Sequence, residues 1–236
     1  MVLLAAWSVA IVGLSGCGGG SDFGFGVSIP QDRQHGIDRP TGAVGSTMLR
    51  LDRPFNVIDA QRRSEGLATA TSNAAPDGRA SCVADASSGG SAVAGFQVGH
   101  VVAYHGSEKF EAVVMFDVAY ECDLDGYETR YGDAPIRLKA YVMDSDRQVL
   151  GQVMLATSDP DRLPTRWSGS QAPSFDVTFE PGLAYHLIVA GQVEVSGSDT
   201  SGPTASLSVT EKVKSYMVLM LILEAGVLGV FLALDL

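Results

Sequence analysis

Three carboxylates follow one another closely near the middle of the chain. Asp123, Asp125 and Glu128 lie within six residues, and a glycine separates the aspartates from the glutamate. Alternating carboxylates ahead of a glycine can present hard oxygen ligands to Ca²⁺. The twelve-residue calcium-loop pattern is incomplete, because its fifth position would be Tyr127 and its twelfth Ala134. A solvated turn is the default interpretation, so the three carboxylates stand as metal candidates only, and the sequence predicts no cofactor.

Other residue types that could support catalysis do not fall into catalytic spacings. His100 and His105 are five residues apart on or beside a predicted strand, so their side chains would point to opposite faces. Ser168 lacks the strand–Gly-x-Ser-x-Gly–helix context of a hydrolase nucleophile. We therefore expect a binding or structural role and not an enzyme. The aromatic residues Tyr127, Tyr131 and Trp167, in turn-rich segments, could line a face for a protein or glycan ligand.

The charge balance bears on the partner. The chain of 236 residues has a formal net charge of -11, and its acidic residues are spread along the sequence, which is typical of a solvated acidic surface. Such a surface offers nothing to neutralise phosphates, so a nucleic-acid partner is excluded.

The cysteine count is compatible with one disulfide. The chain has three cysteines: Cys17 lies in the N-terminal signal described below, which leaves Cys82 and Cys122. One remaining pair in an exported domain is the number that a single disulfide needs. We expect a Cys82–Cys122 disulfide, and the alternative is two buried free thiols.

The N-terminus carries a short apolar stretch that ends in small residues, as a secretory signal does. Its last residues, Leu14-Ser15-Gly16-Cys17, resemble the lipobox of bacterial lipoproteins, although no Lys or Arg precedes the apolar core. The resemblance implies that residues 1–16 are a removed signal peptide, that Cys17 is lipidated and that residues 17–45 are a flexible tether. The partner would then be membrane lipid, and the domain would be membrane-anchored in the periplasm or at the cell surface.

The middle of the chain, residues 46–209, has the pattern of a β domain. Residues 60–90 look loop-like, with a turn at Pro76-Asp77-Gly78. From about residue 91 apolar and polar residues alternate, most clearly from Lys109 to Cys122. Further alternating segments begin at Ile136 and Phe175. Several short strands separated by turns predict an antiparallel sandwich.

One corner of this domain carries a more specific pattern. The segment from Phe179 to Leu187 contains Pro181-Gly182 followed by Tyr185. It resembles the corner between two late strands of fibronectin-type and immunoglobulin-like sandwiches. The resemblance implies that the tyrosine hydroxyl bonds back across the corner. The fold class is therefore mainly β, an antiparallel immunoglobulin-like sandwich, with an N-terminal signal helix and a C-terminal hydrophobic helix.

Residues 210–236 form the predicted C-terminal helix, long and apolar enough to cross a bilayer. Glu224 would lie near mid-depth, where a carboxylate is costly unless it faces protein. Lys212 and Lys214 precede the helix and favour a cytoplasmic location for the preceding segment. The lipobox requires the same segment to be exported, so the two ends of the chain imply conflicting topologies.

The segment from Leu221 to Leu236 resembles a transmembrane helix of the antiporter-like subunit M of respiratory complex I, the proton-translocating NADH-quinone oxidoreductase. It carries that family's Leu-Glu-small-Gly-x-x-Gly-Val-Phe-x-Ala-x-Asp pattern. The family's functional glutamate would follow after Leu236, so the resemblance assigns no proton-transfer role here. Two hypotheses remain: a lipoprotein domain fused to a truncated complex I fragment, or a surface protein whose last helix converged on that pattern.

Overall fold

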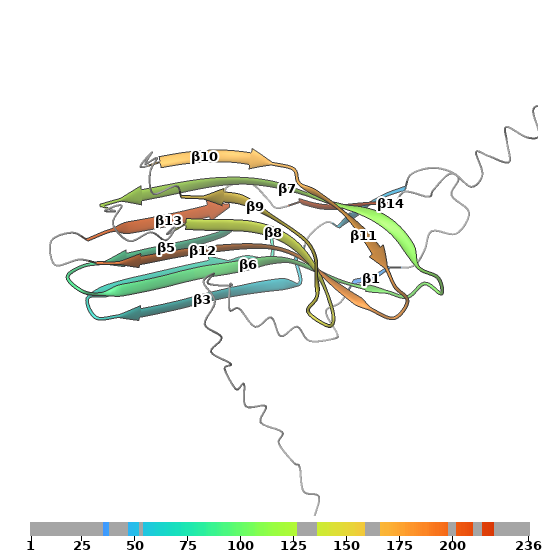
Figure 1. Cartoon of the computed structure of the whole chain (residues 1–236), viewed down its shortest axis with the longest axis horizontal. Helices are drawn as coiled ribbons and strands as arrows, with labels where there is room; N and C mark the ends of the chain where they lie inside the picture. Colours follow the sequence, from blue (N-terminus) through green and yellow to red (C-terminus); the bar gives the residue numbers. More distant parts are fainter. Residues whose placement is uncertain are drawn as a thin grey trace, which may run out of the picture.

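The computed structural model describes residues 35–37, 47–51, 54–126, 136–158, 166–197, 202–209 and 214–219. The described part of the chain is β structure without a helix (Figure 1). It forms β1 (His35–Ile37), β2 (Thr47–Leu51), β3 (Val57–Glu65), β4 (Ala68–Ala74), β5 (Ala80–Ala86), β6 (Ser91–Tyr104), β7 (Phe110–Asp125), β8 (Ile136–Asp144), β9 (Val149–Thr157), β10 (Arg166–Gln171), β11 (Ser174–Phe179), β12 (Ala184–Ser196), β13 (Thr204–Val209) and β14 (Lys214–Leu219).

The first sheet is built on the long strands β6 and β12. Its order is β6-β12-β8-β9, and both β3 and β1 lie along the free edge of β6. All of these pairs are antiparallel except β1 with β6, in which His35 lies opposite Val102. Four strands, β6, β12, β8 and β9, therefore follow one another across the sheet. The position on the other side of β6 is divided between two shorter segments, β3 and β1.

The second sheet is built on β7, which is long enough to hold two strands along each edge. β10 and β11 follow one edge in succession, and β13 and β14 follow the other. β5 and β4 continue the sheet beyond β13, and β2 continues it beyond β14. The arrangement gives an eight-stranded antiparallel sheet, which Figure 1 shows as a layer against the first sheet.

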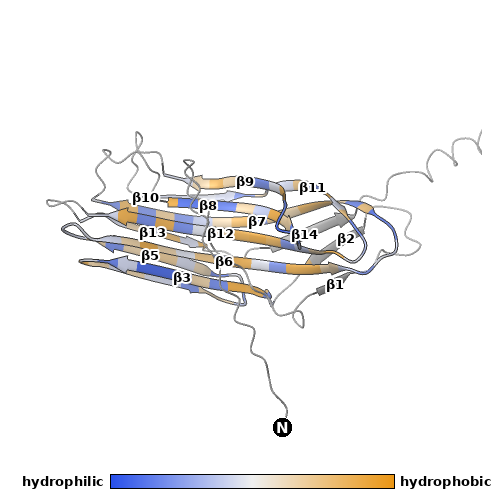
Figure 2. Cartoon of the chain, turned by 60° about the horizontal axis from the view of Figure 1, so that its bottom comes forward, coloured by the Kyte–Doolittle hydropathy of each residue, from blue (hydrophilic) through white to orange (hydrophobic). Residues whose placement is uncertain are grey.

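The core lies between the two sheets and follows from the alternation in the sequence. Successive residues of a strand point to opposite faces, and in β7 the residues from Ala112 to Leu124 at every second position are buried. The matching residues of β6, β8, β12 and β13 complete one apolar cluster, which spans both layers. The orange stretches along these strands in Figure 2 alternate with paler and blue positions. The predicted β-rich core is confirmed.

Two segments differ from the expectation. Residues 60–90 are not a loop, because most of them form β3, β4 and β5; only the turn at Pro76-Asp77-Gly78 is as predicted, with Gly78 N–H donating to Ala75 C=O at 3.0 Å. Ala, Ser and Thr give these strands little hydropathy contrast. Small side chains still fill the core, since Ala80, Ala84 and Ala86 are buried.

The predicted C-terminal helix is wrong for Lys214–Leu219, which form β14 between β7 and β2. Pairing on both edges satisfies the backbone of this segment as well as a helix would. Among the described residues, no helix is long and apolar enough to cross a membrane. The predicted signal at residues 1–16 and the remainder of the C-terminal run at residues 220–236 lie outside the described residues. Three residues of the predicted tether, His35–Ile37, form β1.

Candidate binding face

The candidate site lies on the outer face of the second sheet, where β7, β13 and β5 run side by side. The register places Thr204 of β13 opposite Asp125 of β7 on one side and opposite Asp85 of β5 on the other. Two residues along the strand, Ser206 lies opposite Asp123. Because the alternate residues of these strands fill the core, the carboxylates and hydroxyls necessarily share the solvent side.

These side chains surround an open depression of about 410 Å³, lined by Asp123, Asp125, Thr204 and Ser206. Thr204 Oγ1 donates a hydrogen bond to Asp85 Oδ2 at 2.6 Å, which fixes one wall. Carboxylates and hydroxyls together provide both acceptors and donors. The geometry therefore suits a polar ligand that presents several hydroxyl or amide groups.

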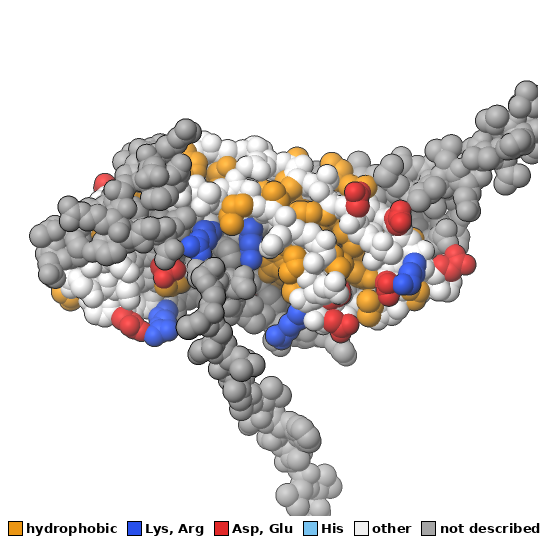
Figure 3. All heavy atoms as spheres, viewed as in Figure 1, with side chains coloured by type: hydrophobic (Ala, Val, Ile, Leu, Met, Phe, Trp, Pro, Cys, Tyr) orange, Lys and Arg blue, Asp and Glu red, His pale blue; other side chains and the backbone are white. Residues whose placement is uncertain are grey.

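The positively charged side chain of Arg166 lies beside this face. Arg166 of β10 donates from Nη2 to Glu121 Oε1 at 2.5 Å, and Asp123 lies close enough to act on it as well. The hydrogen bond that Arg166 donates to Glu121, together with the negative charges of Glu121 and Asp123, raises the pKa of the Arg166 guanidinium. Charged side chains on the face that Figure 3 views are scattered and do not gather into a single patch.

The structure bears on the metal candidates as follows. Asp123 and Asp125 are brought together on the outer face of β7, whereas Glu128 lies outside the described residues. No group of three or more His, Cys, Asp or Glu side chains in the described ranges is placed to hold a metal ion. Thr204, Ser206 and Asp85 were not identified from the sequence. The alternation of polar and apolar residues in Thr204–Val209 could have indicated that Thr204 and Ser206 lie on the solvent side of a strand.

The expected Cys82–Cys122 disulfide is wrong, and both cysteines are buried free thiols. Leu207 of β13 lies opposite Cys82 on one side and opposite Cys122 on the other, so a whole strand separates them. Two strand spacings amount to about 9–10 Å, beyond the Cα separation of about 4.4–6.8 Å that a disulfide spans. Burial raises the pKa of both thiols, that of Cys122 to about 12.

The corner residues Pro181, Gly182 and Tyr185 lie together where β11 leads into β12. Tyr185 Oη accepts a hydrogen bond from Glu180 N–H at 2.6 Å and lies 3.4 Å from Thr178 O, to which it donates. Gly182 has a φ of +77°, in the left-handed region that favours glycine. The hydrogen bond expected across this corner is therefore present.

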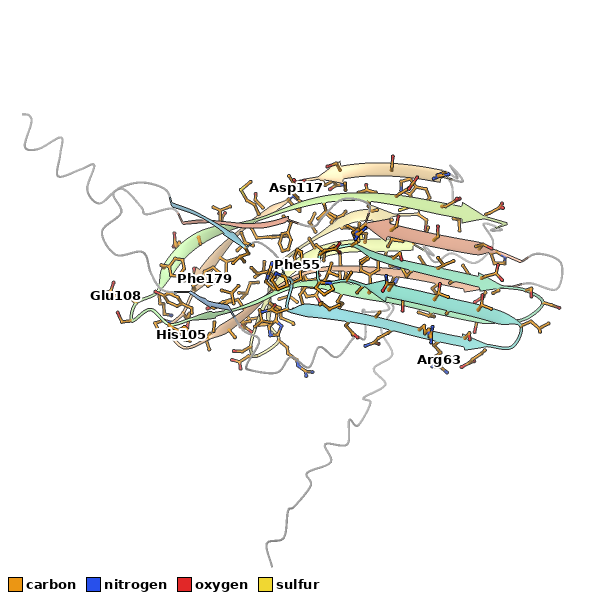
Figure 4. All side chains as sticks on the ribbon, turned by 180° about the vertical axis from the view of Figure 1, so that it is seen from behind. Phe55, Arg63, His105, Glu108, Asp117 and Phe179 are labelled. Carbon is orange, nitrogen blue, oxygen red and sulfur yellow. The ribbon has the colours of Figure 1, made fainter. Side chains whose placement is uncertain are left out.

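An aromatic cluster supports the same end of the molecule. The rings of Phe110 and Phe179 stack with centroids 5.0 Å apart, and Tyr104 and Tyr185 pack around them. Figure 4 shows Phe179 at the same end as the loop that carries His105 and Glu108. Tyr104 Oη donates to Glu108 C=O at 2.6 Å, which closes this loop onto the cluster. The corner is thus a structural feature, on other strands than the polar face.

The remaining candidates are dispersed. Trp167 lies on β10 and packs, partly buried, against the core. His100 is buried and stacks on Phe55 with centroids 4.5 Å apart. Cys17, Tyr127 and Tyr131 lie outside the described residues.

Comparison with known proteins does not assign the chain to a family. No protein-family model matches the sequence, and no curated protein matches it significantly. A solved structure titled "Structure of infectious bursal disease virus Gx strain" is similar over 76% of this chain and 37% of that chain, at 7% identity and a TM-score of 0.21. The strands and their pairing by themselves define the class, a mainly β protein with antiparallel sheets.

Proposed function

We propose that this protein is a lipid-anchored extracytoplasmic binding module, with an immunoglobulin-like sandwich that presents the polar face of β7, β13 and β5 to a ligand. The observation that carries the binding role is the open depression lined by Asp123, Asp125, Thr204 and Ser206. Two carboxylates beside two hydroxyls offer directional hydrogen bonds to a protein or glycan ligand, and polar groups of this kind fix ligand orientation in binding sites.

The anchor is proposed from the sequence. Leu14-Ser15-Gly16-Cys17 followed by glycines resembles a lipobox with a tether, and lipid on Cys17 would hold the domain at a membrane surface. The immunoglobulin-like relation is supported by the corner, where Tyr185 bonds to Glu180 N–H.

The binding role is tested on a glycan array and a peptide array with the soluble Cys17→Ala protein. We expect a ligand whose binding is lost in Asp123→Asn/Thr204→Val. The matched control is Asp59→Asn on β3, at the free edge of the first sheet, which should bind normally. Equal binding by both variants would place the ligand elsewhere.

The anchor is tested independently by metabolic labelling with palmitate. The wild-type chain should incorporate the label, and Cys17→Ala should not. Label that persists in Cys17→Ala would rule out lipidation at this cysteine and leave the binding role untouched.

The second candidate is a fusion that carries part of the complex I subunit M membrane domain. The pattern from Leu221 to Leu236 supports it, whereas the pairing of Lys214–Leu219 into the second sheet ties the preceding segment to the β domain. Sequencing the gene around codon 205 and past codon 236 tests it: a frameshift or a continued reading frame favours the fusion.

A further inference from the structure

The outer face of the first sheet is apolar and buried, which is unusual for the solvent side of a sandwich. Val57, Val101, Ile188 and Ala190 are each at most 1% exposed, and Tyr141 joins them in a cluster separate from the main core. Outward-facing positions of a two-layer sandwich are normally polar. Something must therefore exclude water from this face.

The register defines the face as a compact area across four strands. Val57 of β3 lies opposite Gly99 of β6, which lies opposite Ile188 of β12, which in turn lies opposite Tyr141 of β8. Four strands at about 4.8 Å spacing, and the three outward positions of β6 between 97 and 101 at about 3.3 Å per residue, give an area of about 14 by 13 Å. A single extended segment is wide enough to cover much of it.

Two polar atoms within the face are also shielded from water. Gln97 Oε1 and His186 Nδ1 are buried and have no hydrogen-bond partner among the described residues. Burial lowers the pKa of His186, with Asp144 opposing that shift and Arg147 adding to it. Every described strand belongs to one of the two sheets, so none of them lies across this face.

We propose that residues Phe23–Ile29 dock on this face as an extended segment. Phe23, Phe25, Val27 and Ile29 alternate with Gly24, Gly26 and Ser28. An extended segment places the four apolar side chains on one side, and its length of about 20 Å at about 3.3 Å per residue is enough to cross the face in either direction.

The connectivity favours this segment over the rest of the chain outside the described residues. β1 begins at His35 opposite Val102, immediately beside Val101 of the face, so Ile29 needs only six residues to reach it. Residues 38–46, 127–135, 159–165 and 198–201 each connect a strand of one sheet to a strand of the other, which limits their reach. The apolar run at 220–236 continues from β14, which belongs to the opposite sheet.

The inference does not depend on lipidation of Cys17, and it changes the meaning of the tether. A docked Phe23–Ile29 would leave only the residues from Cys17 to Phe23 between the lipid and the domain. At about 3.3 Å per residue this spans about 20 Å. The first sheet would then face the membrane, and the polar depression of the second sheet would face away from it.

A cysteine scan of the full chain in the Cys17→Ala background tests the docking. Met143, partly buried against the face, is changed to Cys and combined one at a time with Cys at positions 23, 25, 27 and 29. We expect disulfide yields several-fold higher than for the matched controls with Cys at 24, 26 and 28, because only side chains on the docked side come within bonding range. The yields are measured by mass spectrometry of digested protein after mild oxidation.

A second measurement tests the docking without the cysteine variants, in case some of those variants fold poorly. In the double variant Phe25→Ser/Val27→Ser, the apparent pKa of His186 followed by NMR should rise toward its ordinary value, because the face becomes wet. The proposal is overturned by equal yields at odd and even positions, or by equal yields when Ser206→Cys on the other face replaces Met143→Cys. It is also overturned if Leu223→Cys is the preferred partner of Met143→Cys, or if the crosslinks form only between two copies of the chain.

Discussion

At the scale of single residues, Tyr185 connects the end of β11 to the start of β12. The residue is 1% exposed, and its hydroxyl accepts a hydrogen bond from Glu180 N–H at 2.6 Å. Tyr185→Phe should lower the free energy of unfolding by about 1–2 kcal/mol, since it leaves that N–H without its partner. Urea denaturation measures the loss. The control Tyr141→Phe removes a hydroxyl that bonds to no described residue and should cost clearly less; equal losses would remove any special role from the corner bond.

The two buried thiols predict how stability depends on pH. Burial is the main cause that raises both thiol pKa values above their ordinary 9.0 in the folded state. The neighbouring Cys122 raises the pKa of Cys82 further, and Glu121 raises that of Cys122. Stabilisation from the neutral thiols is therefore complete below the unfolded pKa, near pH 9, and is lost progressively as the pH rises from there to the folded pKa values. Between pH 8 and pH 10, under reducing conditions, the unfolding free energy should fall by about 2–3 kcal/mol from this pair.

The comparison variant for that measurement is Cys82→Ala/Cys122→Ala. It should be less stable at neutral pH because two core side chains are truncated, but its stability should decline less steeply above pH 9. Parallel declines in the two proteins would show that the thiols do not titrate differently in the folded and unfolded states.

These residues also show what the sequence can and cannot predict. The alternation from Lys109 to Cys122 correctly placed Cys122 in the core, because side-chain direction is a local property of a strand. It could not show that β13, with Leu207, lies between the two cysteines. Strand order is set by pairing between distant segments, and the same limit hid the approach of Thr204 and Asp85 to Asp125.

At the scale of the elements, prediction succeeded where hydropathy contrast is strong and failed where it is weak. β7, β8 and the β11–β12 corner follow clear alternation, whereas β3, β4 and β5 consist largely of small or polar residues. β14 shows the opposite error. An apolar run such as Lys214–Leu219 fits a buried strand as well as a helix, and periodicity alone does not distinguish them.

The placement of β14 gives a prediction at this scale. Met217 lies opposite Val114 of β7 and Leu49 of β2, so β14 is paired on both edges. Met217→Pro removes a backbone donor from an interior strand and should lower the unfolding free energy by at least about 1 kcal/mol, the cost of one unmade buried hydrogen bond.

The matched variant is Leu223→Pro, which falls within the predicted helix but beyond β14. It should leave the urea midpoint of the β domain unchanged. If both proline variants shift the midpoint equally, residues 217 and 223 belong to one element, and the assignment of Lys214–Leu219 to the sheet would be wrong.

At the scale of the whole molecule, the outer faces of the two sheets differ in chemistry. One carries the buried apolar cluster around Ile188, and the other carries the carboxylates and hydroxyls around Thr204. A lipid at Cys17, joined to the first face through a docked Phe23–Ile29, would give the domain a defined orientation. The polar depression would then be held away from the bilayer, where a ligand can reach it.

This orientation can be measured with fluorophores on the lipidated protein in vesicles that carry a headgroup quencher. Gln152→Cys labels the outer face of the first sheet, since Gln152 is exposed and lies opposite Tyr141; Val83→Cys labels the second, where Val83 is 37% exposed. Labelling at neutral pH should be selective, because the raised pKa values of Cys82 and Cys122 keep both buried thiols unreactive. We expect stronger quenching at position 152 than at position 83.

Releasing the segment provides the control. In Phe25→Ser/Val27→Ser the anchor remains at Cys17, but a freed tether would let the domain tumble, so the difference between the two positions should vanish. A difference that persists in this variant would mean that something other than the docked segment orients the domain. Equal quenching at the two positions in the unmodified background would contradict the orientation itself. Two packed sheets lie about 10 Å apart, so their outer faces lie equally close to the bilayer only if the domain stands on edge or rotates freely.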